Sequence, residues 1–180
     1  MTADEKTMTL HAATIAPVAA MLTNLAEILA KAQAHLDAHG GAESALLGER
    51  LIYDMLPLVR QVQIACDTAK ELAARLAGIE NPAYEDTEAT MDELAARIGK
   101  TAAFLAGVTP EMVNGREAEV IEVPHAEGAR LAAADYAMRH ALPNFYFHVV
   151  TAYAILRENG IPLGKRDYLA HLPLIENAAY

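Results

Sequence analysis

Apolar residues recur at helical spacing in four long stretches of the chain, which are separated by polar connectors. The stretches span residues 10–39, about 52–77, 90–106 and 143–158. Within each stretch, apolar side chains alternate at steps of three and four residues, which places them on one face of an α-helix. Four such helices predict an all-α fold, an antiparallel four-helix bundle whose apolar faces meet around one centre.

Prolines and acidic residues indicate where these helices begin. Pro17 lies inside the first stretch, so we expect a bend or a late helix start near it. In the second stretch we expect Asp54 to cap the helix, with Pro57 in the first turn, where its missing N–H does no harm. Asp135 is expected to cap a short turn, and Pro143 to open the last helix.

The connectors between the later helices have signatures of their own. Residues 79–89 are polar, contain a proline and lack periodicity, which is typical of a surface loop. Thr90 and Glu93 match a capping box, in which the two side chains satisfy free N–H groups at a helix start. Residues 117–123 alternate charged and β-branched side chains, and 129–131 can pair with them. A small β-hairpin before the last helix is therefore predicted.

Length and charge limit the kinds of partner. The chain has 180 residues, which fits one domain over residues 1–180. Its 24 acidic and 14 basic residues give a net charge of −10, the wrong sign for binding nucleic acid or an anionic membrane surface. The most apolar segment, 12–30, contains Pro17, Asn24 and Glu27, which argues against a membrane span. A single cysteine and the lack of a secretory signal favour a cytoplasmic protein.

Several polar side chains fall on apolar helix faces and form the candidate site. His148 and Asn144 are four residues apart on the last helix, and Gln63 and Asp67 are four apart on the second. A buried amide, imidazole or carboxylate costs free energy unless it finds a partner. We therefore expect either an internal hydrogen-bond network or a polar pocket that binds a small molecule.

Three segments carry a resemblance to a known family. They are Leu-Pro-Asn-Phe-Tyr-Phe-His at 142–148, Pro-Leu-Val-Arg-Gln-Val-Gln-Ile-Ala at 57–65 and Gly-Lys-Arg-Asp-Tyr at 164–168. These segments resemble the bacterial family DUF1993, a branch of the DinB/YfiT-like superfamily, and the resemblance extends over the core of the domain, residues 10–169. It implies a four-helix bundle, often dimeric, in which three histidines of the wider superfamily bind a divalent metal.

Residue by residue, this chain departs from that metal site. His148 corresponds to the later histidine of the last helix, but Asn144 stands where its partner is expected. Gln63 or Gln61 stands in place of the histidine of the second helix. An amide oxygen is a much poorer ligand than imidazole for zinc, nickel or iron. We therefore expect no resident cofactor, or at most a weak metal site at His148 completed by Asp67 or by water.

Two functional hypotheses follow from the residues and the resemblance. In the first, the protein is a bundle without catalysis whose polar cluster at His148, Asn144, Gln63, Asp67 and Gln61 binds a small ligand or fixes helix register. In the second, it is a metal-assisted or thiol-dependent transferase like some relatives in the superfamily. A homodimer is expected in either case, because an exposed apolar stripe on bundle helices is commonly covered by a second copy.

Overall fold

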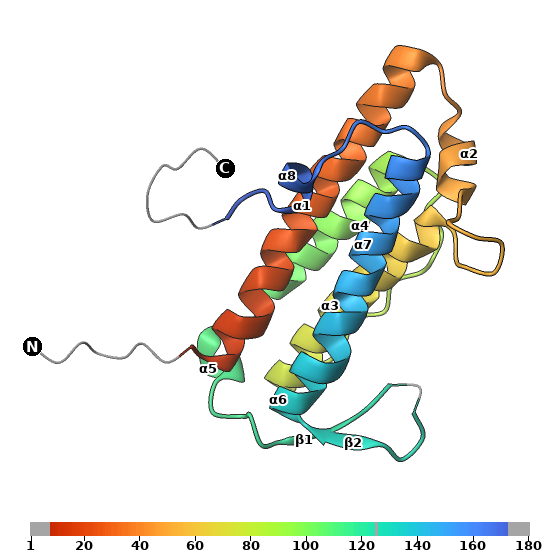
Figure 1. Ribbon diagram of the computed structural model, residues 1–180. Helices are drawn as coiled ribbons and strands as arrows, with labels where there is room; N and C mark the ends of the chain where they lie inside the picture. Colours follow the sequence, from red (N-terminus) through yellow and green to blue (C-terminus); the bar gives the residue numbers. More distant parts are fainter. Residues whose placement is uncertain (1–7, 125, 173–180) are drawn as a thin grey trace, which may run out of the picture.

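Four long helices pack side by side in the computed structural model, which describes residues 8–124 and 126–172 (Figure 1). The long helices are α1 (Leu10–His39), α3 (Leu58–Ala77), α4 (Met91–Ala106) and α7 (Leu142–Glu158). The shorter elements are α2 (Glu43–Gly48), α5 (Pro110–Val113), β1 (Val120–Glu122), β2 (Arg130–Ala132), α6 (Ala133–Tyr136), the π-helix η1 (Ala137–Ala141) and α8 (Lys165–Tyr168). The predicted all-α bundle with a small hairpin is confirmed.

The helix α1 begins earlier than its proline suggests. Thr9 caps it by accepting a hydrogen bond from the Ala12 N–H at 3.3 Å, and the helix runs without interruption through Pro17 to His39. The prediction of a late helix start near Pro17 was therefore wrong. Burial of Leu10 in the core holds the first turns helical, although Pro17 has no N–H to donate to the Ala13 carbonyl.

The helix α3 begins later than predicted. Its N-cap is Pro57, and Asp54 lies in the preceding loop and does not cap it. The residue before a proline is disfavoured in the helical region, so Leu56 ends the loop and Leu58 starts the helix. The apolar residues of this loop therefore face solvent instead of extending the helix face: they are Leu51, Ile52, Tyr53 and Leu56.

Both signals that flank α4 are confirmed. Thr90 and Glu93 form the capping box, and residues 79–89 form an extended loop. The hairpin pairs antiparallel, with Ile121 opposite Leu131.

The last helix departs from prediction at its start. Ala132 is the N-cap of α6, and Asp135 instead pairs with Arg139 at 2.9 Å. Pro143 lies in the first turn of α7, as predicted, but the backbone is already helical before it, from α6 through η1. The π-turn at η1 places the Leu142 N–H on the carbonyl of Ala137, five residues back, directly before the proline that cannot donate.

The core lies where the four long helices face one another. It contains fully buried side chains from each, among them Leu22, Leu72, Leu94 and Phe145. By length and composition α1 could cross a membrane, but half of its most apolar window is buried inside this soluble-type bundle. Its apolar residues therefore serve the core.

Candidate functional site

The imidazole of His148 bonds to Gln61 across the contact between α7 and α3. His148 Nδ1 lies 2.7 Å from Gln61 Oε1. The Gln61 side chain is buried, and its Nε2 donates to the Leu56 carbonyl at 2.9 Å. Because that bond requires the amide nitrogen to point at Leu56, the amide oxygen is the atom that faces the ring. Gln61 therefore acts as an acceptor, and His148 must donate through Nδ1.

This hydrogen bond determines the form of the imidazole. A ring that carries its proton on Nδ1 has a free lone pair on Nε2. Burial lowers the pKa of His148 below its ordinary value, because the half-buried ring loses hydration that would stabilise the cation. Among the described residues, 8–124 and 126–172, Nε2 has no hydrogen-bond partner. His148 is thus a neutral base with one nitrogen held by the protein and one available.

One turn earlier on α7, Asn144 makes a second polar contact with α3. Its Nδ2 donates to the hydroxyl of Thr68 at 3.0 Å. Gln61 and Thr68 are seven residues apart on α3, which places them on the same side of that helix. His148, Asn144, Gln61 and Thr68 therefore form two adjacent bridges between α3 and α7, which we call the α3–α7 bridge.

Gln63 and Asp67 do not belong to this bridge. A step of two residues turns a helix by about 200°, so Gln63 leaves α3 on nearly the opposite side from Gln61. Gln63 donates to Glu88 at 2.7 Å and accepts from Arg60 at 2.6 Å. Asp67, one turn on, faces the same way. The five predicted site residues are therefore split between two sides of α3.

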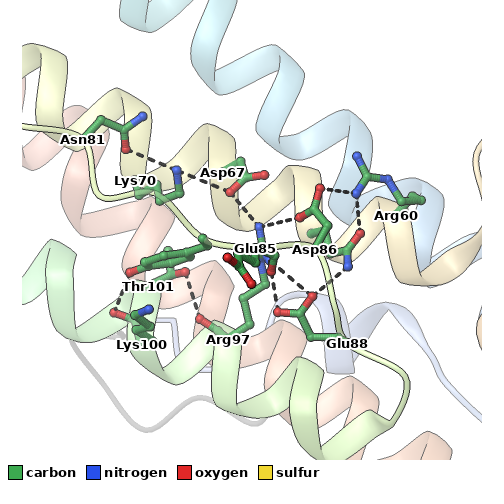
Figure 2. Close-up of polar contacts among 12 residues, drawn as sticks. Arg60, Asp67, Lys70, Asn81, Glu85, Asp86, Glu88, Arg97, Lys100 and Thr101 are labelled. Atoms are coloured by element: carbon green, nitrogen blue, oxygen red, sulfur yellow. Dashed lines mark hydrogen bonds and ion pairs between the residues drawn. The ribbon is translucent and has the colours of Figure 1, made fainter.

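The second side is organised by Arg97 of α4 (Figure 2). Only 2% of its side chain is exposed, and it lies 2.8 Å from Asp67, 3.0 Å from Asp86 and 3.0 Å from Glu88. It also donates to the Glu85 carbonyl at 3.0 Å. The loop 79–90 is thereby tied to both α3 and α4, and we call this group the Arg97 cluster.

Charge is balanced within the Arg97 cluster. Burial alone would raise the pKa of Asp86, but its contacts with Arg60 and Arg97 hold it below the usual range. Burial would likewise raise the pKa of Glu88, and hydrogen bonds from Gln63 and Arg97 lower it. Asp86 and Glu88 thus stay ionised beside Arg60 and Arg97, and the buried Lys70 lies 3.4 Å from Asp67. The role of the Arg97 cluster is therefore structural: it holds the loop 79–90 against α3 and α4.

Sequence reasoning missed Arg97, although a signal was present. Arg97 lies three residues after Leu94 and four before Thr101, both of which are buried on the core side of α4. An arginine on an apolar helix face is seldom buried without acidic partners. The acidic loop 85–88, which we interpreted only as solvated, supplies those partners.

Exposed apolar side chains lie on the helix and the loop that carry the α3–α7 bridge. Phe147 is 55% exposed and packs edge-on against the His148 ring, with 5.2 Å between ring centroids. Val150 is also exposed on α7, but it is two residues from His148, so its side chain leaves the helix on nearly the opposite side. On the α3 side, the loop that contains Leu56 is attached through Gln61. We call the following residues the apolar rim: Leu51, Ile52, Tyr53, Leu56 and Phe147.

The α3–α7 bridge does not fit the divalent metal of the wider superfamily. It offers one imidazole nitrogen and one weak amide oxygen, that of Asn144, because Gln61 Oε1 already accepts from His148 and the Asn144 amide nitrogen donates to Thr68. Asp67, which could have completed a weak site, is held by Arg97 on the other side of α3. Zinc and similar ions need three or four good donors.

The comparisons with known proteins identify a family but no activity. A family model described as a domain of unknown function (DUF1993) matches residues 10–169. A crystal structure of a DinB family member from Shewanella denitrificans is 40% identical to this chain, with a TM-score of 0.87, and the alignment covers 92% of this chain and 94% of that one. No curated protein matches the sequence.

Proposed function

The chain belongs to the DUF1993 family of DinB-like proteins, and from that starting point we propose that it binds a small molecule at the Nε2 atom of His148. The supporting observation is the hydrogen-bond chain from His148 through Gln61 to the Leu56 carbonyl. These two hydrogen bonds fix the tautomer of the His148 ring. The ligand is a molecule with an O–H or N–H donor for Nε2 and an apolar part.

The chemistry of the surroundings supports this ligand class. A neutral imidazole accepts a hydrogen bond through its free nitrogen and does not attract an anion as a cation would. Phe147 is exposed and packs edge-on against the ring, which favours an apolar group there. The Arg97 cluster, by contrast, has its charges paired with one another. The polar and apolar requirements of one small ligand therefore meet at His148.

A titration with 4-fluorophenol tests this proposal, because that probe combines one O–H donor with an apolar ring. Followed by ¹⁹F NMR, the wild-type protein should bind it saturably. His148→Phe retains an aromatic ring but removes the acceptor, and we expect the affinity to fall at least fivefold. His39→Phe makes the same change at an exposed site and should bind as the wild type does. Equal affinity of wild type and His148→Phe would refute the proposal.

The transferase hypothesis has one observation in its favour. The available Nε2 of a neutral histidine is suited to accept a proton, as a thiol would require when it becomes a nucleophile. A metal-assisted form of this chemistry finds a poor donor set at the α3–α7 bridge. Elemental analysis of the purified protein tests it: stoichiometric zinc, nickel or iron that is lost in His148→Ala would favour the transferase. Metal-free, folded protein favours the ligand-binding proposal.

We also propose that the protein is cytoplasmic and that two copies of it associate through the apolar rim. Its exposed side chains Phe147, Leu56 and Tyr53 would lose contact with water in such a dimer, which is the driving force for association. Sedimentation equilibrium should show a dimer that Phe147→Glu dissociates. Met138→Glu introduces the same charge at a similarly exposed position of η1 and should leave the dimer intact. A monomeric wild type would contradict this assignment.

A further inference from the structure

A groove separate from the α3–α7 bridge lies between α1, α7 and the C-terminal segment of the described chain. Figure 1 shows α8 beside the middle of α1, and the segment from Tyr168 to Ala170 is bonded to that helix through Asn24. The groove has a volume of about 750 Å³, within the range of small-molecule sites. Its lining is mostly apolar and consists of Ala12, Ala16, Pro17, Ala20, Met21, Asn24, Tyr146 and Tyr168 to Leu172.

Small side chains on α1 create the space. Ala12, Ala16 and Ala20 recur at steps of four, so they form one stripe along the helix. Pro17 lies beside them and leaves the Ala13 carbonyl without its usual helical donor. Larger side chains at these positions would fill the groove. All three alanines are exposed, so a ligand in the groove can contact them.

Asn24 supplies a buried polar group to this groove. Only 3% of the residue is exposed, and its Nδ2 donates to the Tyr168 carbonyl at 3.0 Å and to the Ala170 carbonyl at 3.1 Å. These two bonds fix the orientation of the amide, because only the nitrogen can donate. The other atom, Oδ1, is buried and has no hydrogen-bond partner among the residues that the structure describes. Such an acceptor calls for a donor from outside.

The opposite wall of the groove carries two tyrosines. Burial raises the pKa of Tyr146, and it raises the pKa of Tyr168, which also lies near Tyr146. Both hydroxyls are therefore uncharged at neutral pH. The residues on α1 and α7 that line the groove carry no charge, and His171 in its C-terminal wall is paired with Glu27 at 2.7 Å, so the groove favours a neutral ligand.

We propose that this groove binds an uncharged, amphipathic small molecule whose apolar body lies along the alanine stripe of α1 and whose hydrogen-bond donor meets Oδ1 of Asn24. The site is independent of His148. Tyr146 and His148 are two residues apart on α7, so their side chains leave that helix on nearly opposite sides. The two sites can therefore be tested separately.

N-phenyl-1-naphthylamine is a suitable probe, since it is uncharged, carries one N–H and fluoresces more strongly in apolar surroundings. Titration of the full-length protein should give saturable binding of one dye per chain. Ala16→Phe fills the groove from an exposed position and should weaken binding at least tenfold. Ala30→Phe makes the same change at an exposed alanine of α1 outside the groove and should bind as the wild type does.

Two further binding measurements test whether the dye occupies this groove. The N-methylated dye lacks the donor and should bind more weakly, by about tenfold. His148→Phe should leave dye affinity unchanged, so this test can succeed when the His148 proposal fails, and the reverse. The inference is overturned if the dye does not saturate, or if Ala16→Phe and Ala30→Phe bind equally well. It is also overturned if affinity falls as protein concentration rises, which would mean that a second copy covers the groove.

Discussion

His148 of α7 donates through Nδ1 to the side-chain oxygen of Gln61 of α3, with 2.7 Å between the two atoms. The bond joins the pair of helices that forms the largest helix contact of the bundle. It also orients the ring so that Nε2 is left for another molecule. The same pair therefore contributes to helix register and to the proposed binding chemistry, and substitutions at either residue test both.

Gln61→Glu should raise the pKa of His148. A carboxylate at this position would still accept from Nδ1, and its negative charge would stabilise the imidazolium. In the wild type the pKa of His148 lies below its ordinary value. An NMR titration of the ring protons should show a higher pKa in the variant. Gln63→Glu, on the other side of α3, is the matched control; an equal rise there would argue against a direct contact.

The free energy of unfolding should depend on pH through His148. Because its pKa is lowered in the folded protein, the unfolded chain takes up the proton first as the pH falls. The contribution of His148 is therefore fully present above its unfolded pKa of about 6.5 and is lost as the pH falls toward the folded pKa. Urea unfolding of wild type and His148→Phe at several pH values measures the difference. A difference that does not change with pH would place the ring in bulk solvent.

Arg97→Met should destabilise the protein by about 3 kcal/mol, because it leaves the carboxylates of the Arg97 cluster without their central partner. Arg139→Met breaks an exposed pair with Asp135 and should cost less than about 1 kcal/mol. Chemical unfolding of the two variants gives the comparison. Similar losses in both would mean that the cluster does not fasten the loop.

Cys66 should be unreactive until the protein unfolds. Burial raises the pKa of its thiol to about 12, so almost no thiolate is present at neutral pH. With Ellman's reagent at pH 8, the native protein should react slowly and the urea-unfolded protein quickly. Rapid reaction of the folded chain would show that α3 is open at this position.

The elements that were predicted well carry local signals. The capping box at Thr90 and Glu93 depends on residues three apart, and the structure has it as expected. The predicted start of α3 was wrong because the prediction gave more weight to the apolar spacing from residue 52 onward than to the effect of Pro57 on the residue before it. The π-turn before Pro143 depends on a backbone adjustment that no residue pattern specifies.

The candidate site was harder to predict than the fold. Gln61 and Gln63 are both buried, so burial could not tell which of them meets His148. The choice depends on the rotation of α3 relative to α7, which is set by packing along the whole helix. Arg97 was missed for a related reason, since its partners lie in a loop whose course follows from tertiary contacts.

The tautomer of His148 is the most direct test of this account, and ¹⁵N-edited NMR of the histidine side chains can read it near pH 7.5. We expect a neutral ring with its proton on Nδ1 and an unprotonated Nε2. In Gln61→Leu, which removes the acceptor, the proton should redistribute toward Nε2. A wild-type ring that is protonated on Nε2, or that carries both protons at this pH, would contradict the proposed site.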